Sequence, residues 1–237
     1  MSDNMQTYAG QTRAVSYDEG LRSYFRRIYN VMTVGLLITG LVAFVSAQIP
    51  GVLALFANPV FAIVFALLPL GLIMFMFRGS AIMTKSAAQL NGTFYVFSAL
   101  FGFCLTPVAV AYAGADLARA FFITAATFAA TSAWSYTTKS DLSRWGSFLF
   151  MGVIGLIIAM VVNIFLGSQM MDFIISCAGV LIYTGLTAYD TQNLKETYAE
   201  SSGTEANNKM AVVGALSLYI NFVNLFLFIL RLLNNRQ

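Results

Sequence analysis

Residues Tyr183–Glu196, with the sequence YTGLTAYDTQNLKE, decide the fold class because they place an acid at the end of a long apolar segment. The segment begins at Met171, and Asp190 falls where the chain should still be inside a membrane or just leaving it. An ionised carboxylate at the bilayer centre costs about 2.5–3.5 kcal/mol on insertion scales. The sequence therefore predicts that Asp190 has a partner or faces a water-filled cavity.

The composition indicates a polytopic, all-α membrane protein. Of the 237 residues, 59% are hydrophobic, 14% aromatic and only 10% charged, whereas soluble domains carry about 25% charged residues. The interior of a soluble chain of this length cannot bury so much apolar surface. The lipid bilayer is therefore the first expected partner.

Seven apolar segments approach the roughly 20 residues that a helix needs to cross the hydrocarbon core. In chain order they are Ile28–Ala47, Val52–Phe77, Gly92–Ala113, Leu117–Tyr136, Gly146–Leu166, Met171–Tyr189 and Met210–Leu233. We expect a seven-helix membrane domain over residues 28–237. Residues 1–27 are expected to form a polar tail with a short interfacial helix, because Ser16 and Glu19 have capping-box spacing.

Basic residues predict the orientation. If the tail and alternate loops share one side of the membrane, that side carries Arg13, Arg22, Arg26, Arg27, Arg78, Lys85, Lys139, Arg144, Lys195 and Lys209. Positive residues stay cytoplasmic, so we expect a cytoplasmic N-terminus. Seven full spans put the C-terminus outside, whereas Arg231 and Arg236 favour a last helix that crosses only in part.

Several function classes are excluded by missing residue types. The chain has no histidine, which removes His-based catalysis and imidazole metal sites. The two cysteines, Cys104 and Cys177, lie far apart in apolar segments and form no metal or redox motif. A single buried acid is a poor proteolytic apparatus. We therefore expect no enzyme activity, no cofactor or metal centre, and no nucleic-acid partner.

Polar residues share one face in each of the last two segments. The seventh segment carries them at spacings of three, four and three, at Gly214, Ser217, Asn221 and Asn224. The sixth segment has a matching face at Tyr183, Thr187 and Asp190. A polar stripe on an apolar helix should face protein or water, so the last helix is expected at the bundle centre. The two faces are candidates for a buried polar seam.

Two further features concern packing and pairing. In the fourth segment Ala125, Ala129 and Ala133 recur every four residues, a pattern that lets helices approach closely in lipid. Arg78 ends the second segment on the same predicted side as Asp190, and a permanently charged guanidinium is a natural partner for a buried acid. The alternative is a surface Arg78 with Asp190 at a solvated helix end.

Five motifs of the chain resemble the Bax-inhibitor family, also called the transmembrane Bax-inhibitor-motif family, in its bacterial branch. They are GFCLTP at 102–107, FITAATF at 122–128, YTTKSDLS at 136–143, GLTAYDTQNLK at 185–195 and ALSLYINFVNLF at 215–226. The resemblance covers essentially all of the chain beyond the tail. It implies a seven-helix fold with the last helix central, in the cytoplasmic membrane of a bacterium.

The resemblance also implies a pH-tuned cation leak, usually of calcium. In the family pattern an Asp ending the sixth span pairs with an Asp in the seventh, and an Arg ending the second span latches the closed pore. Asp190 matches the first Asp and Arg78 the Arg, but Asn221 stands at the second Asp. An Asp–Asn pair lacks like-charge repulsion and offers a cation one carboxylate fewer. Weakened proton sensing is therefore expected.

Two functions remain open at this point. The first is a cation leak channel or transporter, of the calcium type, gated at Asp190. The second is a non-conducting membrane regulator that binds another membrane protein, such as a quality-control protease or a stress-response protein.

Overall fold

The structure is a computed structural model that describes residues 2–76, 79–112, 114–198 and 203–234. Every element in these ranges is a helix, which confirms the all-α prediction for the part described. The helices are α1 (Ser2–Ala47), α2 (Pro50–Phe56), α3 (Pro59–Met76), α4 (Gly79–Thr84), α5 (Ala87–Cys104), α6 (Thr106–Ala111), α7 (Gly114–Thr137), α8 (Trp145–Leu166), α9 (Gln169–Thr197) and α10 (Gly203–Asn234).

Helix ends follow local chemistry. Ser86 caps α5 in a capping box with Gln89. Gly167 ends α8 with a φ of 60°, and Ser168 then accepts a hydrogen bond from the Met171 amide to begin α9. Only a residue that tolerates the left-handed conformation can link two antiparallel helices this tightly.

Two predicted segments are each divided between two helices. The second segment falls on α2 and α3, because Pro59 has no amide hydrogen to continue a helix and begins a new one. The third falls on α5 and α6, which are separated at Leu105, two residues before Pro107. Among the described residues, four helices are long and apolar enough to cross a membrane: α8, α9, α10 and residues Asp18–Ala47 of α1.

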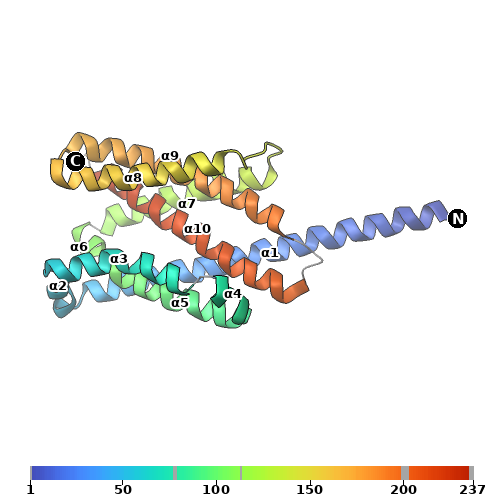
Figure 1. Cartoon of the computed structure of the whole chain (residues 1–237), viewed down its shortest axis with the longest axis horizontal. Helices are drawn as coiled ribbons and strands as arrows, with labels where there is room; N and C mark the ends of the chain where they lie inside the picture. Colours follow the sequence, from blue (N-terminus) through green and yellow to red (C-terminus); the bar gives the residue numbers. More distant parts are fainter. Residues whose placement is uncertain (1, 77–78, 113, 199–202, 235–237) are drawn as a thin grey trace.

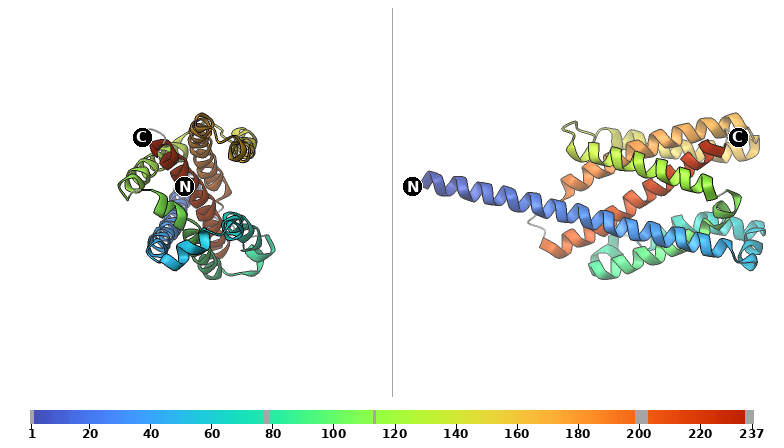
Figure 2. Two further views of the ribbon diagram at one scale, coloured as in Figure 1. Left: turned by 90° about the vertical axis from the view of Figure 1, so that its left-hand side faces the viewer. Right: turned by 180° about the vertical axis from the view of Figure 1, so that it is seen from behind.

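Helix α10 lies at the centre of the bundle. It runs obliquely between a layer formed by α7, α8 and α9 and a layer formed by α1 to α5 (Figure 1). The end-on view shows the other helices surrounding it (Figure 2). It packs against α1, α5, α7 and α9. The N-terminal part of α1 extends beyond the bundle (Figure 1).

The core of the bundle is built on two sides of α10. On one side the buried ring of Tyr219 packs on Phe94 and Phe97 of α5, and its hydroxyl lies 2.6 Å from Thr39 Oγ1 of α1. On the other side Phe228 stacks on Tyr183 of α9, with ring centroids 5.8 Å apart. Aromatic packing therefore fixes α10 against both layers.

The first turns of the predicted interfacial helix take part in this core. Leu21, Tyr24, Phe25 and Ile28 of α1 are buried in a cluster that includes Leu194 of α9. The division into a polar tail at 1–27 and a membrane domain at 28–237 stays a prediction.

Gly179 provides a test of the contact between α9 and α10. A Cβ atom on Gly179 would lie 2.5 Å from Cγ of the Phe228 ring, which is held by Tyr183. We expect Gly179→Ala to lower the free energy of unfolding in detergent by about 1–3 kcal/mol, since added atoms in a packed core force side chains to move.

The matched control is Gly155→Ala on exposed α8, where an added Cβ meets nothing within 4 Å. This change should leave stability unchanged or raise it. Equal thermal midpoints for wild type and Gly179→Ala would contradict the close contact.

Candidate functional site: the Asp190 seam between α9 and α10

The site is centred on the half-buried carboxylate of Asp190 in α9. Its Oδ2 atom accepts a hydrogen bond from Ser217 Oγ at 2.5 Å and another from Asn221 Nδ2 at 2.7 Å. Both donors belong to α10 and lie one turn apart on the same face. The structure therefore brings together three of the residues on the predicted polar faces.

The close approach of α10 to α9 makes these bonds reachable by short side chains. Gly214 lies one turn before Ser217, and a Cβ atom there would lie 2.5 Å from Cδ2 of Leu194. Absence of a side chain at 214 lets Leu194 pack against the α10 backbone. Gly214, Ser217 and Asn221 thus lie on one face of α10, where Gly214 allows the close contact with α9 and the other two donate hydrogen bonds to Asp190.

Asp190 is held by neutral donors rather than by an ion pair. Among the residues that the structure describes, the Arg119–Asp116 pair at 3.7 Å is a salt bridge of α7, and no Lys or Arg pairs with Asp190. Hydrogen bonds to a charged group contribute about 1.5–3 kcal/mol each, enough to offset part of the desolvation cost. Arg78, the predicted latch, lies outside the described residues, so the latch stays a prediction.

The remaining residues of the predicted seam make contacts of their own. The Thr187 hydroxyl is fully buried and donates to the Tyr183 carbonyl one turn before it. Tyr183 stacks on Phe228, and Asn224 Nδ2 donates to the Ile220 carbonyl of α10 at 2.9 Å. These three residues continue the polar faces along the helices without a hydrogen bond to Asp190.

A second polar network, which the sequence analysis did not identify, fixes the other side of α9. The Tyr29 hydroxyl of α1 lies 2.5 Å from Ser132 Oγ of α7, and Ser132 Oγ lies 2.9 Å from Thr191 Oγ1. The Ser135 hydroxyl donates to the Ala188 carbonyl. Ser132 and Ser135 lie three residues apart in α7, a spacing that places them on one helix face, but the alanine pattern there was the stronger signal.

The loop between α7 and α8 is bound to the C-terminal part of α9. Gln192 Oε1 accepts from the Leu142 amide, and Gln192 Nε2 donates to the Ser140 carbonyl, both at 2.7 Å. Lys195 Nζ donates to the Tyr136 carbonyl at 2.8 Å. Residues two and five positions after Asp190 therefore position the helix that carries it.

The donor set around Asp190 limits what the site can bind. It consists of one carboxylate, one hydroxyl and one amide, and the described residues contain no group of three or more His, Cys, Asp or Glu side chains placed to hold a metal ion. Calcium prefers six to eight oxygen ligands, with several carboxylates among them. The arrangement suits brief contact with a cation better than a resident ion.

The sequence matches known proteins over nearly its whole length. The model of the family "Inhibitor of apoptosis-promoting Bax1" matches residues 21–237. An uncharacterized protein of Rickettsia prowazekii is 37% identical over 237 residues, covering 100% of both chains. Inner membrane protein YbhL of Escherichia coli is 40% identical over 222 residues, covering 92% of this chain and 94% of its own. An uncharacterized membrane protein of Streptococcus pyogenes is 36% identical over 221 residues, covering 91% and 93%. The chain is therefore a membrane protein that belongs to the Bax inhibitor family.

Proposed function

We propose that this protein is a cation leak channel or transporter of the bacterial cytoplasmic membrane, with a gate at the Asp190 seam and no enzymatic activity. The observation that carries the proposal is the half-buried Asp190 carboxylate, held inside the bundle by Ser217 and Asn221 of α10. Acids at membrane depth are costly and mark ion pathways. Calcium is the proposed cation, and seven spans are the proposed topology.

The hydrogen-bond geometry supports passage of a cation past this group. Both bonds from α10 go to Oδ2, while Oδ1 accepts none from the described part of the chain. A cation that reaches Oδ1 gains a charged ligand without first displacing Ser217 or Asn221. A site with one carboxylate binds weakly, and conduction requires that an ion can leave as readily as it enters.

Charge at the two ends of the bundle supports the proposed orientation. The end formed by the last turns of α7 and α9 carries Arg22, Lys139, Lys195 and Lys209, so we place it in the cytoplasm. In a chain with both native cysteines replaced, Ala206→Cys should resist an impermeant thiol reagent in intact cells, and Ala115→Cys at the opposite end should react. The reverse labelling pattern would show that the orientation in the membrane is opposite to the one proposed.

The direct test is calcium flux into liposomes that contain only this protein. Calcium flux into liposomes that contain the wild-type protein should exceed the flux into protein-free liposomes. Asp190→Asn should lower the flux severalfold, because the amide keeps the size of the side chain and removes its charge. Asp116→Asn is the matched control, since Asp116 pairs with Arg119 on α7 and lies away from the seam.

Two results would contradict the channel proposal. Wild-type flux equal to the protein-free baseline would favour the non-conducting regulator that binds a membrane protease or stress-response protein. Equal losses in Asp190→Asn and Asp116→Asn would show that the Asp190 seam is not the gate.

The pH dependence provides a separate prediction. Asn221 donates to the carboxylate at 2.7 Å, so this chain has no second acid beside Asp190 at that position. We expect wild-type flux to vary only weakly between about pH 6 and 8. Asn221→Asp should create a steep dependence and a stronger calcium preference, because two adjacent carboxylates cannot both ionise easily and together offer a cation two charged ligands.

Calcium flux against pH, wild type beside Asn221→Asp, measures this effect, with Asn224→Asp one turn away as control. A steep neutral-range transition already present in the wild type would show that Asp190 senses protons without a second acid.

A further inference from the structure

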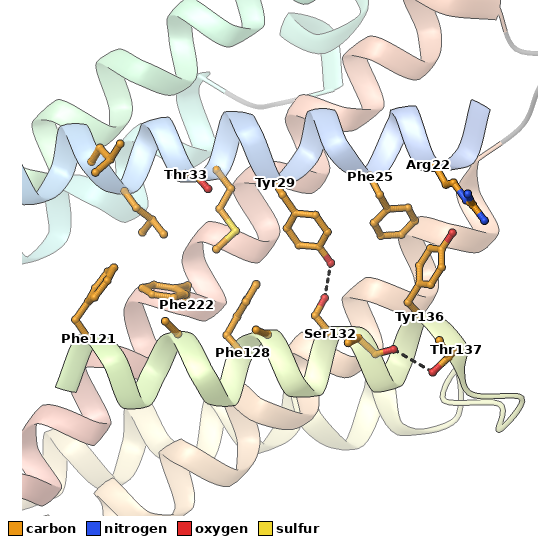
Figure 3. A pocket seen from close by; sticks show the side chains of 16 residues that line it. Arg22, Phe25, Tyr29, Thr33, Phe121, Phe128, Ser132, Tyr136, Thr137 and Phe222 are labelled. Atoms are coloured by element: carbon orange, nitrogen blue, oxygen red, sulfur yellow. Dashed lines mark hydrogen bonds between the residues drawn. The ribbon is translucent and has the colours of Figure 1, made fainter. Parts of the chain in front are cut away.

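An open groove lies between α1 and α7, away from the Asp190 seam. It has a volume of about 740 Å³, and Phe222 of α10 lies at its floor. Figure 3 shows α1 and α7 as its two walls, with Phe25 and Tyr29 extending from α1 towards Tyr136 and Ser132 of α7. This volume is in the range of about 300–1,000 Å³ that is typical of small-molecule sites.

The small residues of α7 keep this groove open. Ala125, Ala129 and Ala133 all line it, and Ala129 and Ala133 are exposed. The sequence favoured close helix packing for this face, but in the structure no described helix covers it. The opposite wall presents Met32 and Leu37 of α1, the latter 67% exposed. An apolar chain can therefore lie between the helices without displacing side chains.

Two of the hydroxyl groups that line the groove bond to each other. The Tyr29 hydroxyl and Ser132 Oγ form the hydrogen bond that joins α1 to α7, and Ser132 continues to Thr191 of α9. These bonds leave an apolar surface for most of the groove length (Figure 3). An occupant of the middle section therefore gains mainly the burial of apolar surface.

One end of the groove is cationic. The Arg22 side chain is exposed at this rim beside Tyr136 and Thr137 (Figure 3), and it forms no ion pair with the described residues. Lys195 Nζ lies 5.1 Å from the centroid of the Tyr136 ring. Among the described residues that line the groove none is acidic; Glu19 and Asp18, three and four residues before Arg22, are the nearest acids along α1.

The apolar surface continues beyond this groove towards the other end of the bundle. A second cavity of about 610 Å³ shares Leu36, Phe121 and Phe222 with the first and extends to Gln48 at the end of α1. The two cavities follow α1, a candidate membrane span, so an extended chain aligned with the bilayer lipids fits along them.

We propose that the α1–α7 groove binds one anionic phospholipid. Its phosphate headgroup contacts Arg22 at the cationic rim, and an acyl chain lies along Phe128 and Ala129. A phospholipid matches both features of the groove, which are its apolar surface and the unpaired charge at its end. A helix from a second copy of this chain would fill the apolar part of the groove but would leave Arg22 without an anion.

Native mass spectrometry of the full-length protein tests this assignment. Purified protein is titrated with phosphatidylglycerol or with phosphatidylcholine of the same acyl chains, and the singly lipid-bound population is measured. Wild type should bind phosphatidylglycerol more tightly. Arg22→Gln should reduce the preference about fivefold, the equivalent of ~1 kcal/mol for a basic residue at an anionic headgroup. Arg26→Gln, an exposed arginine one turn along that does not line the groove, should leave the preference unchanged.

A second pair of variants tests the apolar part of the groove. Ala129→Trp should abolish binding of both lipids, whereas Ala130→Trp, an exposed neighbour outside the groove, should bind like wild type. Thermal unfolding of each variant checks its fold, and if Ala129→Trp is unfolded the arginine pair decides alone. Equal wild-type affinity for the two lipids, equal losses in Arg22→Gln and Arg26→Gln, or a protein dimer that disappears in Ala129→Trp would each overturn the proposal.

Discussion

The hydrogen bonds from α10 to the Asp190 carboxylate are the interaction on which the rest of the structure depends. A carboxylate inside a helical bundle loses its water, and Ser217 and Asn221 replace part of that hydration at 2.5 and 2.7 Å. These short side chains reach Asp190 only because α10 lies at the centre of the bundle and Gly214 lets α9 approach closely. The central place of the last helix therefore lets it supply hydrogen bonds to the half-buried acid as well as apolar packing.

The elements around this contact bind α9 at several positions along its C-terminal half. Gln192 binds the α7–α8 loop, Lys195 binds the end of α7, and Thr191 connects through Ser132 to Tyr29 of α1. Thr191 is the next residue after Asp190, so one helical turn of α9 contacts both Ser132, in the α7 wall of the groove, and the Asp190 seam. A ligand that separates α1 from α7 would act on the Tyr29–Ser132 bond and through it on the turn that carries Asp190.

Sequence periodicity predicted the polar face of α10 because Ser217 and Asn221 have helical spacing. The position of Asp190 on an apolar segment predicted that its carboxylate has a partner. Periodicity did not predict that the second and third segments are divided at Pro59 and near Pro107, since a long apolar run continues across these helix ends. It also assigned Ala129 to helix packing, whereas that residue lines a groove. Periodicity defines which face a residue occupies but not which neighbour covers it, so the contacts of Ser132 and Gln192 required the structure.

A double-mutant cycle between Asp190 and Ser217 tests the central claim most directly. Unfolding free energies of wild type, Asp190→Asn, Ser217→Ala and the double variant are measured in the same detergent. A direct hydrogen bond predicts that the two single losses do not add, with a coupling energy of about 0.5–2 kcal/mol. Losses that add to within about 0.3 kcal/mol would show that the two side chains do not interact, and the account of the seam would be wrong.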